Sequence, residues 1–240
     1  MIEARGLRKS FGPVAAVTDV GFTAGDRAVT GLLGPNGAGK STTLRMIYTV
    51  LRPDAGRIAI DGVDALTEAE AARRRIGVLS AQPGLYRELS VRENIRYFGA
   101  LHGLGRAELA QRVEELIEQL GLADCALRRA GTLSQGQRVK TALARALVHS
   151  PQNVLLDEPT NGLDVPAIRT LREIILALKA AGKCVLFSSH VMQEVGAVCD
   201  RLVVIAQGRV VADATPAELA AGHDGRLEDA FVAAVGAGSP

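Results

Sequence analysis

Residues 34–42 read Gly-Pro-Asn-Gly-Ala-Gly-Lys-Ser-Thr, and this stretch decides the fold of the chain. It fits the phosphate-loop pattern G-x-x-x-x-G-K-S/T. The apolar run Ala28–Leu33 precedes it, and Leu44, Ile47 and Leu51 recur at helical spacing after it. A strand, a glycine-rich loop and a helix in this order are the setting in which the pattern binds phosphate. The stretch therefore predicts a nucleotide-binding loop in an α/β protein.

Each residue type in this loop has a chemical reason to be there. Glycines let backbone N–H groups turn toward phosphate oxygens, and the start of the following helix adds partial positive charge. Lys40 is expected to reach the β- and γ-phosphates, and the Ser41 hydroxyl to ligate Mg²⁺. A glycine-rich turn without a ligand is the alternative, which the flanking strand and helix disfavour. The residues expected to bind ATP here are Gly34, Pro35, Asn36, Gly37, Ala38, Gly39, Lys40, Ser41 and Thr42.

Two carboxylates follow the apolar run Asn153–Leu156. In a doubly wound sheet, ligands bind at the carboxyl ends of the strands, so Asp157 is expected to hold Mg²⁺ and Glu158 to act as general base. An acid after a strand is also common as a helix cap or a solvated corner. His190 follows the predicted strand 183–187 at the same edge, although a lone histidine is more often structural.

A second group of polar residues precedes a helical pattern at 139–147. Ser134 and Gln137 match a capping box, S-x-x-Q, and with Gly136 beside them this helix start is equally suited to an anion. The two interpretations are compatible. Asp164, which precedes Val165-Pro166, is either a simple helix N-cap or a functional carboxylate.

The rest of the chain alternates strand and helix patterns. Further strands are predicted at 14–23, 57–60, 76–79, 201–205 and 210–212, with a hairpin turn at Gln207-Gly208. Helical stripes of apolar residues cover 109–120 and 139–147. Residues 85–150 contain no convincing strand and are expected to form a helical insert between two α/β halves. A loose tail is expected at 236–240.

Composition excludes several other classes. The formal net charge is only +2, aromatic residues make up 3% and tryptophan is absent, so neither charge nor base stacking favours nucleic acid as a ligand. The three cysteines, Cys125, Cys184 and Cys199, show no metal-binding spacing and are expected to be inert thiols in a reducing compartment. No signal peptide and no run of about 18 apolar residues is present, so a cytosolic chain is expected.

Five motifs in one order resemble those of the ATP-binding-cassette (ABC) ATPases: GPNGAGKST, LSQGQ, VLLDEP, NGLD and SSH. The resemblance covers nearly the whole chain. It implies the P-loop NTPase fold of that family, a RecA-like core with an antiparallel β subdomain and a helical subdomain. One domain is expected over 1–235, with the α/β lobe at 1–84 and 151–222, the helical lobe at 85–150 and a C-terminal helix at 223–235.

The same resemblance implies roles for individual residues. Phe11 would stack on adenine, His190 would contact the γ-phosphate, and Lys40 and Glu158 would complete the catalytic set. Asp164 would communicate across a homodimer. In that dimer Ser134, Gly136 and Gln137 would bind the ATP held by the other subunit.

Two positions depart from the family pattern. Gln135 stands where the signature often has glycine. In the Q-loop, the alignment puts Ala81 at the glutamine position, so either Gln82 supplies the metal-facing side chain after a local shift or the link is steric. Tyr86, next to this loop, is either a core residue or a contact with a partner.

The pattern also resembles one branch of the family. Residues 188–195, Ser-Ser-His-Val-Met-Gln-Glu-Val, are similar to the sodium-exporter group of ABC-2-type cassettes. This resemblance implies an ATPase that drives export through a separate integral-membrane permease, at the inner face of the cell membrane, with sodium as one candidate cargo. A soluble ABC ATPase acting on nucleic acid or ribosomes is the alternative.

Overall fold

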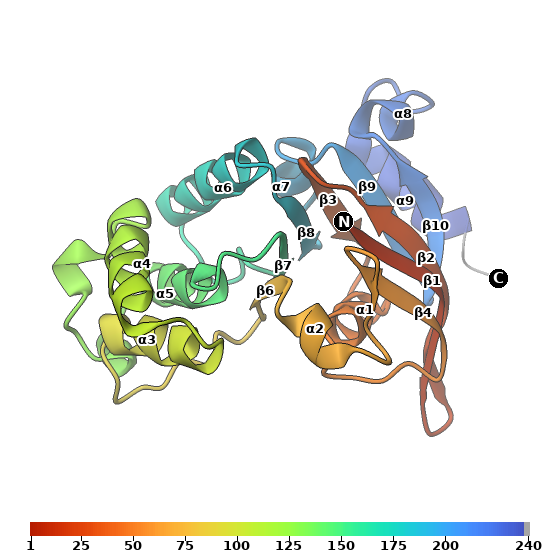
Figure 1. Cartoon of the computed structure of the whole chain (residues 1–240). Coiled ribbons are helices and arrows are strands. Elements are labelled where there is room, and N and C mark those ends of the chain that lie inside the picture. The colour runs from red at the N-terminus through yellow and green to blue at the C-terminus, as the bar shows by residue number, and fades with distance from the viewer. Residues whose placement is uncertain (238–240) are drawn as a thin grey trace.

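One ten-stranded sheet organises the molecule in the computed structural model, which describes residues 1–237 apart from the side chains of residues 193, 194 and 237 (Figure 1). The strands are β1 (Ile2–Phe11), β2 (Val14–Ala24), β3 (Ala28–Leu33), β4 (Ala55–Ile60), β5 (Val63–Asp64), β6 (Ile76–Leu79), β7 (Asn153–Asp157), β8 (Cys184–Ser189), β9 (Arg201–Ala206) and β10 (Arg209–Ala214). Their spatial order is β5-β4-β1-β2-β10-β9-β3-β8-β7-β6.

The sheet has two parts with different pairing. Strands β9, β3, β8, β7 and β6 pair in parallel, whereas β2, β1, β4 and β5 pair antiparallel. Strand β10 joins the parts, because it pairs antiparallel with β9 and in parallel with β2. This is the predicted α/β fold with a RecA-like parallel core and an antiparallel β subdomain.

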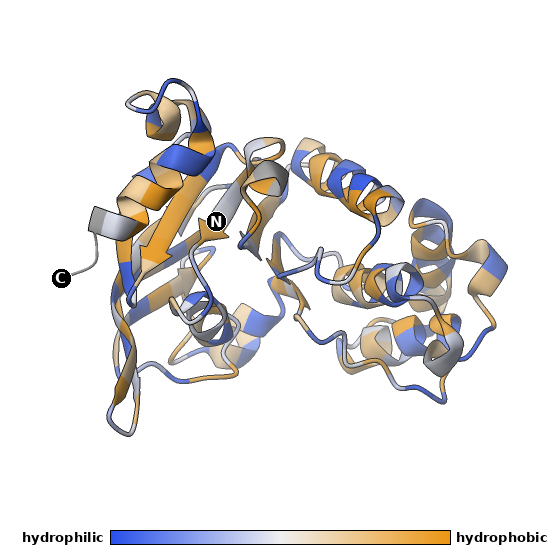
Figure 2. Cartoon of the chain, turned by 180° about the vertical axis from the view of Figure 1, so that it is seen from behind, coloured by the Kyte–Doolittle hydropathy of each residue, from blue (hydrophilic) through white to orange (hydrophobic). Residues whose placement is uncertain are grey.

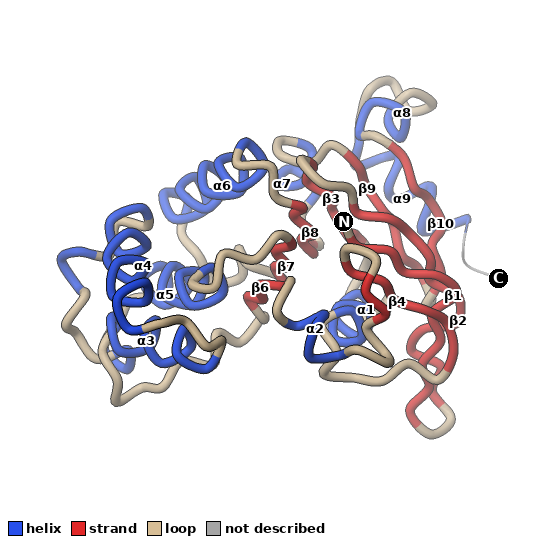
Figure 3. The backbone as a smooth tube through the Cα atoms, viewed as in Figure 1, coloured by secondary structure: helices blue, strands red, loops and turns tan. Residues whose placement is uncertain are grey.

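The helices divide into a lobe of their own and a set around the sheet (Figure 3). The α-helices are α1 (Lys40–Ile47), α2 (Ala69–Arg73), α3 (Val91–Leu101), α4 (Arg106–Gln119), α5 (Gln135–Leu147), α6 (Val165–Ala180), α7 (Met192–Gly196), α8 (Pro216–Ala220) and α9 (Leu227–Ala237). Helices α3, α4 and α5 lie together beside the β6 edge of the sheet (Figure 1). They fall within the predicted helical insert.

Two apolar cores hold these parts together. One contains the buried faces of α3, α4 and α5 together with one face of the parallel strands, for example Val154 and Phe187. The other packs α1 and the antiparallel strands against the opposite face, with Leu44 and Ile58 fully buried or nearly so. In Figure 2 the helices of the helical lobe carry both hydrophobic and hydrophilic colour along their length, as one-sided packing requires.

The apolar patterns located most elements but missed β1. Its buried residues are Ile2, Ala4 and Leu7, and the register shifts between Ala4 and Leu7. Gly6 lies within that shift at φ 60°. A bulge of this kind interrupts the two-residue period that a strand prediction relies on, so the strand was not recognised.

The structure corrects two boundaries of the chain's helices. The helix after the phosphate loop ends at Ile47, so Leu51, expected on its apolar face, follows the helix instead. The C-terminal helix α9 extends to Ala237, so the tail does not begin at 236; residues 238–240 lie outside the described part. Within residues 1–237, no helix combines the length and the apolar composition that crossing a bilayer requires.

Candidate active site

The start of α1 is shaped by glycines that no other residue can replace. Gly39 is the N-cap at φ 106°, and a Cβ there would lie 2.6 Å from the Ala16 carbonyl oxygen. A Cβ at Gly34 would lie 2.2 Å from the Ile205 carbonyl oxygen. No side chain caps this helix, so its first N–H groups stay available to a ligand. The close approach of the loop to β2 and β9 thus produces an open, positively polarised helix start.

Lys40 is held at the centre of this loop. Its side chain is 5% exposed, and Nζ donates to the carbonyl oxygens of Gly34 at 2.7 Å and Pro35 at 3.3 Å. Nζ also lies 3.4 Å from Oε1 of Glu158. A buried ammonium group with one carboxylate and two carbonyl partners supplies the local positive charge that a phosphate needs.

Asp157 ends β7 and lies beside the loop. Its Oδ1 accepts a hydrogen bond from Ser41 Oγ at 3.1 Å and another from Ser188 Oγ at 2.8 Å. The side chain is almost fully buried. Ser188 was not singled out from the sequence; the available signal was a polar residue on an otherwise apolar strand that pairs with the strand carrying Asp157.

Glu158 and His190 meet across the end of the sheet. Oε2 of Glu158 lies 2.7 Å from Nδ1 of His190, and the Glu158 side chain is only 10% exposed. The backbone of Glu158 adopts φ 49°, a left-handed conformation that is uncommon outside glycine. Carboxylate, imidazole and ammonium groups therefore form one connected set: His190, Glu158 and Lys40.

One pocket at the carboxyl ends of β3, β7 and β8, which we call the phosphate pocket, is lined by Lys40, Glu158 and His190. Asp157 lies next to it, in contact with the lining residue Ser41. The volume of the pocket is about 470 Å³. Its lining residues are Phe11, Ala16, Asn36, Gly37, Ala38, Gly39, Lys40, Ser41, Thr42, Glu158, Asn161 and His190. Phe11 is 49% exposed and presents an aromatic surface at the pocket. The structure thus brings loop residues 36–42 together with the predicted base and the histidine, whereas Gly34 and Pro35 do not line the pocket. The pocket lies at the edge of the sheet where α/β proteins bind ligands.

The signature residues lie in a different pocket, the signature pocket, of about 440 Å³. It is lined by Gly121, Ser134, Gln135, Gly136, Gln137, Lys140, Gly162, Leu163, Asp164, Pro166, Ala167 and Thr170. The predicted capping box is present, since Ser134 Oγ accepts from the Gln137 N–H and Gln137 Oε1 accepts from the Ser134 N–H. Asp164 caps α6 by accepting from the Ala167 N–H at 3.0 Å. Within one chain, these residues do not share the phosphate pocket.

Of the three predicted metal-facing residues, Ser41 lines the phosphate pocket and Asp157 contacts the Ser41 hydroxyl, whereas Gln82 lines neither pocket. It is exposed, and its backbone carbonyl accepts from Ser80 Oγ at 2.6 Å. The structure therefore does not bring Gln82 together with Ser41 and Asp157.

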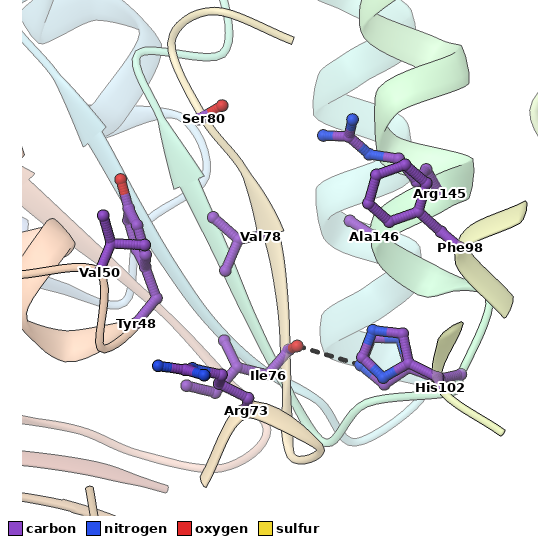
Figure 4. Close-up of a pocket in the computed structure, with 11 residues that line it drawn as sticks. Tyr48, Val50, Arg73, Ile76, Val78, Ser80, Phe98, His102, Arg145 and Ala146 are labelled. Atoms are coloured by element: carbon purple, nitrogen blue, oxygen red, sulfur yellow. Dashed lines mark hydrogen bonds between the residues drawn. The ribbon is translucent and has the colours of Figure 1, made fainter. Parts of the chain in front are cut away.

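A third hollow, the inter-lobe groove, lies between α1 and β6 on one side and the helical lobe on the other (Figure 4). Its volume is about 360 Å³, and it is lined by Tyr48, Val50, Arg73, Ile76, Val78, Ser80, Phe98, His102, Arg145, Ala146 and His149. Val50 is 73% exposed. The mostly apolar lining and the exposed valine distinguish this groove from the two polar pockets.

The charged groups of the groove lack carboxylate partners among residues 1–237. Arg145 stacks over Phe98 at 4.5 Å and donates to the Gly84 carbonyl, and burial lowers its pKa. The rings of His102 and His149 stack at 3.6 Å. Burial, with His102 as a further cause, lowers the pKa of His149 to about 4, so the pair is neutral at pH 7.

Tyr86 extends the groove onto the surface. It packs edge-on against Tyr97 with ring centroids 5.2 Å apart, and both rings contact Phe98. Tyr86 is 49% exposed, so the expectation of a core tyrosine is wrong. The three cysteines are buried, as expected, and burial raises the pKa of Cys184 to about 12.

The phosphate pocket can perform a hydrolytic reaction. It combines an open helix start and an ammonium group for phosphate oxygens with a carboxylate for proton removal. The imidazole of His190 contacts the Glu158 carboxylate and fixes its position. The arrangement is that of a nucleoside triphosphatase.

Comparison with known proteins identifies the family. A family model described as "ABC transporter" matches residues 17–161. The chain is 46% identical to the ABC transporter ATP-binding protein NatA of Bacillus subtilis over 199 residues, which are 82% of this chain and 81% of that protein. It is 39% identical to the Nod factor export ATP-binding protein I of Rhizobium sp. (strain N33), over 93% of this chain and 74% of that protein.

A further relative and a solved structure agree. The chain is 37% identical to the daunorubicin resistance ATP-binding protein DrrA3 of Streptomyces coeruleorubidus, over 98% of this chain and 74% of that protein. A solved structure described as the ATP-binding subunit of an ABC transporter superposes with a TM-score of 0.88 at 30% identity, covering 98% of this chain and 99% of that one. The chain therefore belongs to the ABC transporter family, as an ATP-binding subunit that hydrolyses ATP.

Proposed function

We propose that two copies of this chain close around two ATP molecules and drive export through a membrane permease of the ABC-2 type. One observation carries the proposal: two helix starts suited to phosphate lie in separate pockets of the same chain. Each pocket alone would contact one side of a nucleotide. Pairing the phosphate pocket of one copy with the signature pocket of another completes the site.

In this proposal the phosphate pocket binds the triphosphate. Lys40 transfers its contacts from the Gly34 and Pro35 carbonyls to the β- and γ-phosphates, and the α1 N–H groups bind the remaining oxygens. Phe11 stacks on adenine, which its exposed ring at the pocket supports.

Mg²⁺ fits the donor set of this pocket. Ser41 Oγ and Asp157 Oδ1 are hard oxygen donors 3.1 Å apart. Among the side chains that the structure describes, no cluster of three or more His, Cys, Asp or Glu residues is suited to a metal. A cation that is satisfied by one or two protein oxygens, water and phosphate matches this set. When bound, Mg²⁺ neutralises charge on the phosphates. We propose Ser41 and Asp157 as its protein ligands, and Gln82 as a third only if its loop moves.

Glu158 is proposed as the general base and His190 as the residue that holds it. The 2.7 Å contact orients the carboxylate, and the 3.4 Å contact with Lys40 has to loosen when phosphate takes the ammonium group. Glu158 is then available to accept a proton from the attacking water, while His190 contacts the γ-phosphate.

Across the dimer, Ser134, Gly136 and Gln137 of one copy are proposed to contact the γ-phosphate bound by the other. Asp164, in the same signature pocket, is proposed to transmit the state of one site to the second. ATP holds the copies together in this arrangement, so hydrolysis to ADP releases them.

The membrane partner is proposed to dock at the inter-lobe groove and at residues 80–94. The groove presents apolar side chains and arginines that have no carboxylate partner among the described residues, and Tyr86 and Gln82 lie exposed beside it. Such a surface fits a cytosolic segment of a permease, and this fit supports the proposal that the chain works at the inner face of the membrane. Relatives whose names contain "export" support this proposal over action on nucleic acid or ribosomes.

Sodium is the proposed cargo, on the resemblance of residues 188–195 to the sodium-exporter branch. The test is to purify the chain with the membrane protein that accompanies it and to reconstitute both in vesicles. ATP-driven sodium efflux supports both parts of the proposal. Efflux of another cargo with unchanged ATP coupling overturns the sodium assignment, and co-purification with RNA instead of a membrane protein overturns the transporter assignment.

A further inference from the structure

Ser188 occupies a fixed place between the two strands that form the phosphate pocket. It lies near the end of β8, where it pairs with Leu32 of β3 on one side and with Asp157 of β7 on the other. It is completely buried. Strand alternation places it on the same face of β8 as Cys184 and Leu186, which belong to the core packed against α1. A hydroxyl at this point faces the nucleotide loop from within the sheet.

The hydroxyl makes one hydrogen bond to each of the two acidic residues. Its Oγ donates to Oδ1 of Asp157 at 2.8 Å and accepts from the backbone N–H of Glu158 at 2.9 Å. Ser41 Oγ lies 3.1 Å from the same Oδ1. A serine hydroxyl has a single proton, so this proton is committed to Asp157.

These two contacts act on different parts of the reaction centre. The bond to Oδ1 fixes the rotation of the Asp157 carboxylate and leaves Oδ2 without a hydrogen-bond donor among the described residues. The bond from the Glu158 N–H holds a peptide whose residue adopts the uncommon φ of 49°. The direction in which the Glu158 side chain leaves the sheet depends on that backbone conformation.

We infer that Ser188 is a positioning residue that orients Asp157 toward the metal and sets the backbone from which Glu158 acts as base. The inference rests on the magnesium site and the base proposed above. A residue that only satisfied a buried N–H group would leave metal dependence unchanged, so the two roles make different predictions.

Three variants separate these roles. Ser188→Ala removes the hydroxyl, and Ser188→Thr keeps it. Thr30→Val is the matched control, because it deletes another buried hydroxyl from the neighbouring strand β3 without touching Asp157 or Glu158. For Ser188→Ala we expect kcat to fall and the Mg²⁺ concentration for half-maximal activity to rise. The combined change in the two quantities should be about 10- to 100-fold, the usual effect of losing a hydrogen-bond partner of a metal ligand.

A second readout does not depend on turnover. The melting temperature of each variant is measured with ATP and EDTA, and again with ATP and Mg²⁺. Wild type, Ser188→Thr and Thr30→Val should gain further stability from Mg²⁺, whereas Ser188→Ala should lose at least half of that gain. The stability given by ATP in EDTA should be the same for all four proteins.

Each result has a defined meaning. An unchanged Mg²⁺ requirement and melting shift in Ser188→Ala overturns the inference while the magnesium site stands. Equal losses in Ser188→Ala and Thr30→Val, in proportion to their melting temperatures, also overturn it, because they indicate packing alone. Absence of any Mg²⁺ effect in wild type overturns the proposed metal site and the inference together.

Discussion

Helices α1 and α5 both begin at a pocket suited to phosphate, yet the two helix starts are built differently. The start of α1 has a glycine N-cap and no side-chain cap, and Lys40 and Glu158 surround it. The start of α5 is capped by its own Ser134 and Gln137, and the signature pocket contains no catalytic set. Asp164, the carboxylate in that pocket, is engaged in capping α6.

The difference indicates that the two helix starts have different functions in ATP hydrolysis. The α1 start combines an ammonium group with the carboxylate of Glu158, whereas the α5 start offers hydroxyl, amide and backbone groups with Lys140 nearby. In the proposed dimer, two identical chains arranged head to tail would present both kinds of helix start to each nucleotide. Changes at α1 should therefore remove binding, and changes at α5 should remove hydrolysis while binding persists.

The largest effect is expected for Lys40→Ala. Among the described residues, Lys40 supplies the ammonium group at the α1 start. Nucleotide affinity should therefore fall, and hydrolysis should drop by about 10²–10³-fold or more, the cost of removing one donor from a site of charge development. Isothermal titration with ATP and a phosphate-release assay measure the two quantities. Lys183→Ala serves as control, because Lys183 precedes β8 at the end of that strand opposite to the phosphate pocket. A turnover equal to wild type in Lys40→Ala would contradict the assignment of the phosphate pocket as the site of ATP hydrolysis.

The next effect concerns α5. Gly136→Asp places a carboxylate at the helix start that faces the other copy's γ-phosphate, where like charges about 4 Å apart repel by about 4 kcal/mol near a surface. Hydrolysis should fall strongly, while the isolated chain should still bind ATP with wild-type affinity. Gly105→Asp adds the same charge at the start of α4, where a new side chain meets open space, and should retain activity. If Gly136→Asp loses binding as Lys40→Ala does, the two helix starts do not differ as proposed.

A smaller effect is expected at the exposed junction beside the inter-lobe groove. Gln82→Ala should lower transport per ATP several-fold in reconstituted vesicles, with little change in hydrolysis by the isolated chain, because Gln82 lies outside the phosphate pocket. Gln111→Ala on α4 is the matched control. Equal transport per ATP in Gln82→Ala and wild type would show that this residue has no part in coupling.

The smallest effect is on stability. The pKa of His149 is lowered to about 4 in the folded chain, from an ordinary value of 6.5, so the unfolded chain binds this proton first as pH falls. Its contribution to stability is therefore complete above pH 6.5 and is lost between pH 6.5 and 4. Since part of the ring is solvated, we expect about 1–2 kcal/mol. Urea unfolding at pH 7 and pH 4.5 measures it. The pH dependence should be shallower in His149→Gln; identical slopes would exclude His149 as the source.

The residues of the phosphate pocket could be predicted from the sequence, because phosphate binding requires particular residue types at fixed spacing. Gly39 and Gly34 have no alternative near the carbonyls of Ala16 and Ile205. Likewise, Asp157 had to follow an apolar strand. The sheet order and the bulged strand β1 were not accessible, because register shifts and strand neighbours depend on long-range packing.

The role of Ser188 and the presence of the inter-lobe groove were not predicted from the sequence, for a different reason. Serine, arginine and histidine have many roles, and their function here follows only from what the fold places beside them: Asp157 next to Ser188, and Phe98 under Arg145. Gln82 shows the opposite case: it was considered for the site only if a local shift replaced Ala81, and in the structure it lies on the surface.

The account depends most on the claim that the two helix starts meet across two copies. Glu158→Gln keeps the size of the side chain and removes the base, so hydrolysis should fall by about 10²–10⁴-fold and ATP should remain bound. The decisive measurement is the light-scattering mass of Glu158→Gln in saturating ATP and Mg²⁺, over a range of protein concentrations. The account predicts a mass that approaches twice that of the chain with ATP and returns to one chain with ADP. A mass that stays at one chain at every concentration would contradict it.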